Sequence, residues 1–135
     1  MRRILQPDGW PEPAGYSNGI AADGVQIFVA GQIGWNERGE IVSADFAEQS
    51  AQALRNIVAV LHEAGARPEH LVRLTWYVVD KSEYEAARKA LGRHYRSIVG
   101  DAYPAMTLVQ VAGLLEPGAK VEIEATAVLP AGPKP

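Results

Sequence analysis

Apolar and polar residues alternate with a period of two in the second half of the chain, as in β-strands with one covered face. The alternation covers residues 71–79, 103–111 and 120–128. It is most regular in the last stretch, where Glu122 and Glu124 share one face. The opposite face of this predicted strand carries Val121, Ile123, Ala125 and Ala127. Whether the two carboxylates are merely solvated or take part in chemistry therefore depends on what covers their face.

Apolar residues at helical spacing predict helices over residues 45–64 and 82–100. Each stretch begins with a pair typical of a capping box, Asp45 with Glu48 and Ser82 with Glu85. Gly65 and Gly100 are the expected helix stops. The predicted apolar stripes are Phe46, Leu54, Ile57, Val58 and Leu61 in the first helix, and Tyr84, Ala87, Leu91, Tyr95 and Ile98 in the second.

The N-terminal part predicts short strands separated by turns. Residues 2–15 contain the apolar pair Ile4-Leu5, followed by prolines and glycines that interrupt regular structure, which indicates an edge strand and a loop. The Asp23-Gly24 dipeptide then separates residues 19–22 from residues 25–30. Because Asp-Gly suits a tight turn, this pattern predicts a β-hairpin.

The order of these elements predicts an α+β domain with both helices on one face of a single sheet. Residues 1–129 form this one domain, and residues 130–135 are a C-terminal tail with nothing to bury. The strands carry apolar residues on both faces, whereas two helices cover only one face. The remaining face therefore predicts an oligomer that forms through the sheet.

Composition narrows the classes of function. The chain of 135 residues has no cysteine, which excludes disulfides, thiol catalysis, cysteine-bound zinc and iron–sulfur centres. Its net charge of -3 argues against a protein that coats a phosphate backbone, so nucleic acid is a disfavoured partner. Neither a signal-peptide core nor a stretch of about 20 apolar residues is found, so we expect a cytoplasmic protein without a membrane partner.

Few residues have a pattern that indicates chemistry. The histidines His62, His70 and His94 are scattered without metal-ligand spacing, so no metal site is expected. Nucleophile-elbow, phosphate-loop and dinucleotide motifs are missing, so no cofactor is expected. What remains is Glu122 and Glu124, with the aromatic residues Tyr16, Trp35 and Tyr103 near predicted loops. On pattern alone, a solvated strand face explains both glutamates.

A series of short motifs, in order along nearly the whole chain, resembles the RidA family, also called the YjgF-like or reactive-intermediate enamine/imine deaminase family. Each motif alone is weak evidence for the family, and the resemblance rests on their occurrence together and in the same order. The motifs are Tyr16-Ser17-Asn18-Gly19, residues 27–33 ending in Gly31-Gln32-Ile33, Gln49, Asn56-Ile57, Ala64-Gly65, residues 72–80, Pro104-Ala105 and Val121-Glu122-Ile123-Glu124-Ala125.

The resemblance implies a chorismate-mutase-like α+β fold that assembles as a homotrimer, with ligand clefts between neighbouring subunits. For typical members it also implies hydrolysis of enamines or imines derived from amino acids, to a 2-keto acid and ammonia, without a cofactor. Some relatives have been described as endoribonucleases or translation inhibitors.

The resemblance also assigns site residues. Glu122 matches the glutamate that handles the attacking water, and is the expected catalytic residue. Met106 stands where typical members have an arginine after Pro-Ala that holds the substrate carboxylate, and Leu108 stands where a cysteine is often found. A hydrogen bond to a charged group contributes about 1.5–3 kcal/mol, and methionine offers none. The expected substrate-binding residues are Tyr16, Gly31, Trp35, Arg88, Tyr103, Met106 and Thr107.

Arg88 occupies a position where some relatives carry an asparagine that lines the cleft. It offers a substitute cation from another direction, although an arginine on a helix is more often a solvated or ion-paired surface group.

These residues support two hypotheses. In the first, the protein binds a small molecule in a cleft between subunits and hydrolyses an apolar or weakly charged imine, enamine or related compound. It is then not a typical 2-aminoacrylate deaminase, because Met106 replaces the arginine. In the second, it is a non-catalytic trimeric binding or regulatory protein. Ribonuclease activity is the least favoured, because the acidic chain lacks the arginine that could bind a phosphate.

Overall fold

The computed structural model of the chain describes residues 1–132, so residues 133–135 of the expected tail lie outside the described part. The strands are β1 (Arg2–Leu5), β2 (Gly19–Ala22), β3 (Val25–Gln32), β4 (Leu71–Val78), β5 (Ala105–Gln110) and β6 (Val121–Leu129). The helices are α1 (Phe46–Glu63), α2 (Lys81–Ala86) and α3 (Arg88–Ile98), with a 3-10 turn, η1 (Pro68–His70), before β4.

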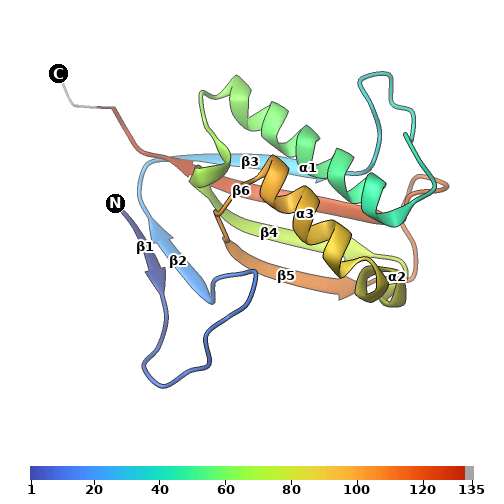
Figure 1. Ribbon diagram of the computed structural model, residues 1–135. Helices are drawn as coiled ribbons and strands as arrows, with labels where there is room; N and C mark the ends of the chain where they lie inside the picture. Colours follow the sequence, from blue (N-terminus) through green and yellow to red (C-terminus); the bar gives the residue numbers. More distant parts are fainter. Residues whose placement is uncertain (133–135) are drawn as a thin grey trace.

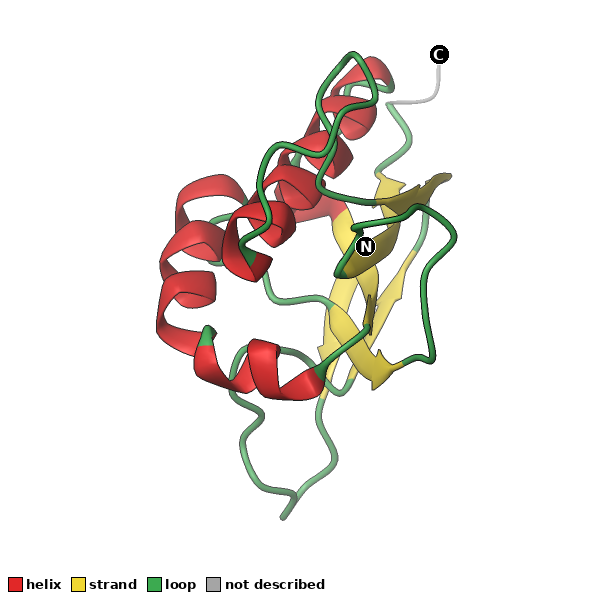
Figure 2. Ribbon diagram, turned by 90° about the vertical axis from the view of Figure 1, so that its right-hand side faces the viewer, coloured by secondary structure: helices red, strands yellow, loops and turns green. Residues whose placement is uncertain are grey.

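The main sheet has four strands in the order β3-β6-β4-β5. β6 is antiparallel to both of its neighbours, and β5 is parallel to β4. Helices α1 and α3 lie side by side on one face of this sheet (Figure 1). Seen from the side, the molecule has a helical layer and a strand layer, and the far face of the sheet carries no helix (Figure 2). The predicted α+β fold with helices on one face is confirmed.

The N-terminal strands pair differently from the prediction. β2 pairs with β1 in a separate two-stranded sheet and not with β3 across Asp23-Gly24. β3 pairs instead with β6, where Ile27 and Val29 face the core opposite two alanines. This longer pairing buries the apolar face of β3 under α1, which a local hairpin with four-residue β2 does not achieve.

The predicted second helix is two helices in the structure. α2 and α3 meet at Ala87, whose φ of -94° and ψ of 4° interrupt the helical path. The N-cap of α2 is Asp80 and not Ser82 as predicted, because Asp80 Oδ1 accepts hydrogen bonds from Ser82 N at 2.9 Å and Ser82 Oγ at 2.6 Å. The predicted cap of α1 is confirmed, since Asp45 Oδ2 accepts from Glu48 N at 3.0 Å.

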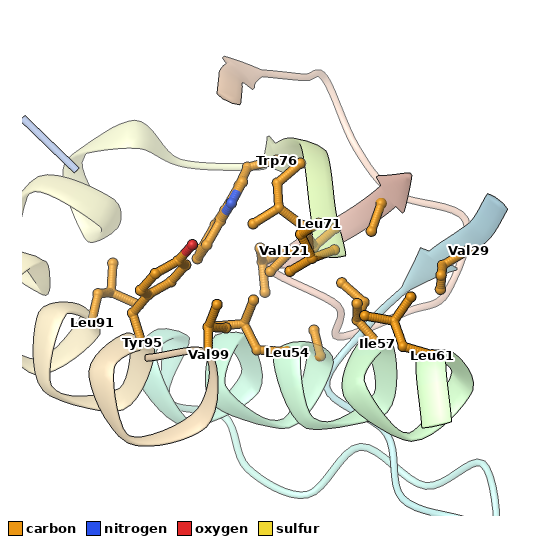
Figure 3. Close-up of a cluster of buried hydrophobic side chains, with 14 of the residues drawn as sticks. Val29, Leu54, Ile57, Leu61, Leu71, Trp76, Leu91, Tyr95, Val99 and Val121 are labelled. Carbon is orange, nitrogen blue, oxygen red and sulfur yellow. The ribbon is translucent and has the colours of Figure 1, made fainter. Parts of the chain in front are cut away.

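The core lies between the helices and the sheet (Figure 3). Leu54, Ile57 and Leu61 of α1 point from the helix toward the strands, where Val121 lies. A register shift at the start of β4 makes Leu71 fully buried, while the next residue, Val72, is half-buried. β6 alternates as predicted, whereas in β4 the outward Thr75 is buried together with Leu74 and Trp76.

Gln49 is a fully buried polar residue that connects three segments of the chain. Its Nε2 donates to Ser43 O at 2.9 Å and Gly118 O at 3.0 Å, and its Oε1 accepts from Lys120 N at 2.9 Å. Gly34 makes room for this residue, because a Cβ at Gly34 would lie 2.6 Å from Gln49 Cα. The start of α1 is thereby fixed to the loop that leads into β6.

Replacing this residue tests its structural role. Gln49→Leu keeps the volume but removes three hydrogen bonds, so we expect the free energy of unfolding to fall by about 2–4 kcal/mol. Chemical unfolding at fixed protein concentration measures the change. Arg55→Leu, at an exposed position on the same helix, is the control and should change stability by less than about 0.5 kcal/mol. Equal effects of the two variants would contradict the role of Gln49.

Candidate functional site

The helix-free face of the sheet carries both glutamates of β6. Val121 and Ile123 are buried beneath the helices, so Glu122 and Glu124 point to the other side. On β4, Tyr77 lies opposite Glu122 and Thr75 lies opposite Glu124. The shared face predicted from the alternation is therefore confirmed.

The two glutamates have different surroundings. The Tyr77 hydroxyl donates to Glu124 Oε1 at 2.7 Å. This hydrogen bond, followed by burial and the nearby negative charges, raises the pKa of Tyr77 above its usual value. In the described part of the chain, no hydrogen bond or ion pair reaches the Glu122 carboxylate. Glu122 is thus the glutamate with a free carboxylate.

Gly31 makes space for that carboxylate. A Cβ at Gly31 would lie 2.7 Å from Glu122 Oε2 and 2.8 Å from Glu122 Cδ, closer than real Cβ contacts. The pairing of β3 with β6 shifts register between Val29 and Gln32, which brings Gly31 into a bulge at this point. The glycine and the glutamate therefore form one local unit, as the predicted site requires.

Met106 and Leu108 point to the opposite side of the sheet. They lie beside Leu74 and Trp76 of β4 and pack against the core under the helices, while Thr107 between them is exposed on the helix-free face. Glu122 and Met106 therefore lie on opposite faces of the sheet in one chain. A cleft that contains both residues requires a second copy.

A groove of about 430 Å³ lies on the helix side, between β5, α3 and the N-terminal loop. We call it the α3 groove, and define it by its lining residues. Its floor includes Trp76, Met106 and Leu108, and Tyr103 lies at its border with the N-terminal loop. Arg88 and Arg96 line it from α3. The remaining lining residues are Ala14, Gly15, Tyr84, Leu91, Gly92 and Tyr95.

Tyrosines join the α3 groove to the N-terminal loop. The rings of Tyr95 and Tyr103 stack with centroids 5.3 Å apart, and the buried Tyr95 hydroxyl donates to Ala102 O. Burial, with the negative charge of ionised Tyr103 as a smaller cause, raises the pKa of Tyr95 far above its usual value.

The N-terminal loop reaches this end of the groove. Ser17 N donates to Pro104 O at 3.0 Å. Tyr16 and Tyr103 line a smaller hollow there, of about 260 Å³.

The structure thus divides the predicted site into two groups. Arg88, Tyr103 and Met106 line the α3 groove. Gly31, Thr107 and Glu122 lie on the helix-free face. The other two predicted residues belong to neither group. Tyr16 lies beside Tyr103 at the end of the α3 groove. Trp35 lies in the loop before α1, away from the groove, and its carbonyl accepts a hydrogen bond from Asn56 Nδ2 at 2.9 Å.

Among the groove residues that the sequence interpretation does not assign to the site are Trp76, Tyr84, Tyr95 and Arg96. Tyr84 and Tyr95 belong to the predicted apolar stripe of the second helix. A signal for Arg96 exists in the spacing of Arg88, Gly92 and Arg96, which puts all three on one helical face.

Two negative findings concern residues 1–132. No helix in this part is long and apolar enough to cross a membrane. No group of three or more histidine, aspartate and glutamate residues in it is placed to hold a metal ion.

Comparison with known proteins agrees with this architecture. The family model described as Endoribonuclease L-PSP matches residues 11–129. The chain belongs to this family, the RidA/YjgF family. A RutC family protein from Aquifex aeolicus is 35% identical over 130 residues, covering 95% of this chain and 99% of the relative. The human 2-iminobutanoate/2-iminopropanoate deaminase is 31% identical over 130 residues, covering 95% of this chain and 90% of the relative.

Solved structures of the RidA family have the same fold. The Rid family protein YyfB from Yersinia pestis, described as of unknown function, superposes with a TM-score of 0.83 at 36% identity, covering 95% of this chain and 98% of that one. Met106 and Leu108 occupy adjacent inward positions of β5, and together they make the floor of the α3 groove apolar.

A substitution at Gly31 tests the contact with Glu122. Gly31→Ala should lower the free energy of unfolding by about 1 kcal/mol, because the new methyl group forces the flexible Glu122 side chain out of its position. In a Glu122→Ala background the same change should be close to neutral, since the overlapping atoms are gone. Unfolding of the four proteins measures this coupling.

Gly113→Ala is the matched control, because a Cβ there meets nothing within 4 Å. Additive costs of the Gly31 and Glu122 substitutions would show that the two residues do not interact.

Proposed function

We propose that this RidA protein binds an imine or enamine that carries an apolar side chain, in a cleft between two copies of the chain. Glu122 hydrolyses the bound compound by acting as general base and general acid. The observation that carries the proposal is the free Glu122 carboxylate held against Gly31 on a sheet face without a helix. A relative named as an imine deaminase, 31% identical over nearly the whole chain, supports the reaction type.

The proposed chemistry needs one carboxylate and water. An enamine first becomes the imine, as its β-carbon gains a proton and its nitrogen loses one. Glu122 then accepts a proton from water as the oxygen attacks the imine carbon, and returns that proton to the nitrogen. It then takes the hydroxyl proton of the resulting carbinolamine and passes it to the departing nitrogen as the C–N bond breaks. The products are a carbonyl compound and ammonia, and Glu122 is regenerated without a cofactor.

A second copy completes the cleft in this proposal. β5 is an edge strand, and the α3 groove lies on its inward side, whereas Glu122 lies on the helix-free face. A neighbouring copy that docks its helix-free face near the β5 edge brings its own Glu122 toward Met106. Phe28 on β3 supports such docking, because this residue of the helix-free face is 72% exposed. The homotrimer implied by the family resemblance is the assembly we propose.

Met106 sets the proposed substrate apart. Without a strand arginine, a small anion such as 2-aminoacrylate loses its usual partner, and a thioether favours an apolar body. The same observation supports an alternative function, a trimer that binds such molecules without catalysis.

Ammonia release distinguishes the two functions. The wild type should hydrolyse the imine that an amino-acid oxidase makes from leucine faster than freshly generated 2-aminoacrylate. Met106→Arg should increase the rate on 2-aminoacrylate at least about tenfold, because a guanidinium binds its carboxylate. Glu122→Gln, an isosteric change, should lower both rates about 10²–10⁴-fold.

A wild type no faster than buffer on either compound contradicts catalysis. If the Met106→Arg variant alone is active, the non-catalytic alternative is supported.

The proposed assembly has its own test. Phe28→Lys places a charge on the helix-free face of β3, and should convert the oligomer to monomers, as measured by sedimentation velocity. Trp10→Lys is the control, because Trp10 is an exposed aromatic residue in the N-terminal loop, 58% exposed. A monomeric wild type, or an oligomer that survives Phe28→Lys, would contradict assembly through this face.

A further inference from the structure

We propose that the α3 groove binds a small carboxylate with an apolar body, and that Arg88 and Arg96 of α3 are its anion-binding groups. The proposal rests on the proposed function for the use of this groove, and names the class of ligand. In this proposal the carboxylate is bound by arginines of helix α3 and not by a residue at position 106 on strand β5.

The two arginines are free to bind a ligand. In residues 1–132 neither forms an ion pair, and none of the groove's lining residues is acidic. Arg88 lies over the ring of Tyr84, with its guanidinium carbon 5.7 Å from the ring centroid. This cation–π contact holds the side chain at the groove without using its hydrogen-bond donors for a carboxylate partner.

Gly92 leaves a gap between the arginines. Positions 88, 92 and 96 follow one another at four-residue spacing, so they share a helical face. Arg96 Nη1 lies 3.4 Å from where a Gly92 Cβ would be, so the Arg96 guanidinium reaches back over the glycine toward Arg88. A planar guanidinium fork binds a carboxylate through two parallel hydrogen bonds, and two forks around a gap strengthen this preference.

The floor of the groove suits an apolar body. Met106, Leu108 and Leu91 line it with flexible or branched apolar side chains. The volume of about 430 Å³ lies in the range of small-molecule sites and accommodates a ring. The apolar floor and the basic helix together describe an amphipathic acid.

Trp76 adds an independent observation. Its side chain lines the groove and is 4% exposed, and its indole Nε1 is buried without a hydrogen-bond partner in the described part of the chain. Figure 3 shows its ring next to Tyr95 at the α3 side of the core. Buried donors are nearly always paired, so an unpaired indole N–H in a side chain of the groove floor is unusual, and a ligand oxygen becomes its partner when the floor side chains shift to admit the ligand.

Binding measurements test the proposal without any turnover. Isothermal titration of the wild type with 3-phenylpropanoate should show binding at least about tenfold tighter than with 3-phenylpropanamide, which has the same body without the charge. Arg88→Gln and Arg96→Gln should each weaken binding of the acid about five- to tenfold and leave the amide unchanged. Arg93→Gln, an exposed arginine of α3 outside the groove, is the matched control and should have no effect.

Nuclear magnetic resonance provides a second measurement. The chain has three tryptophans, and Trp76→Phe identifies the Trp76 indole N–H signal, which the acid should shift on binding. Equal affinity for acid and amide, no binding of either, tighter binding of phenyl phosphate than of the acid, or an equal loss with Arg93→Gln would each overturn the proposal.

The ammonia assay and the titration fail independently. A protein that binds the acid through α3 and releases no ammonia contradicts only the proposed catalysis. A protein that hydrolyses the leucine-derived imine but binds acid and amide equally contradicts only the anion site.

Discussion

The two-residue period of β6 is the constraint on which the structure depends. β6 lies between β3 and β4, so its inward residues meet α1 and its outward residues form the middle of the helix-free face. Val121 and Ile123 have no exposed surface. A shift of one residue in its register would place glutamates under the helices and valine in solvent, which is strongly unfavourable. Core stability and the outward position of Glu122 are therefore set by the same alternation.

The same geometry explains how much was predictable from the sequence. The faces of β6, the Asp45 cap and the helical stripe of α1 follow from local periodicity, because each depends on neighbours within a turn or a strand. The pairing of β2 with β1 was not predictable from the Asp23-Gly24 turn. That pairing depends on which distant strand buries the apolar face of β3, and the competing partner, β6, is about 100 residues away along the chain.

The candidate site was predictable only in part, for a related reason. Glu122 and Met106 were found from motifs, but their positions on opposite faces follow from the register of β4 with β5 and β6. Arg96 and Trp76 come from separate elements, and only packing brings them to one groove. A motif identifies residue types along the chain, whereas a groove collects residues from several elements.

The link between the N-terminal loop and β5 has a consequence for the α3 groove. Ser17 attaches to the segment just before β5, because its backbone N–H donates to Pro104 O and its hydroxyl donates to Tyr103 O. Ala14 and Gly15 precede this attachment and close the end of the α3 groove. No residue of this loop belongs to the core cluster, so its contribution to the α3 groove is confined to the groove's end. The end of the α3 groove at the N-terminal loop is therefore separate from the core, whereas its floor, with Trp76 and Leu91, is part of the core.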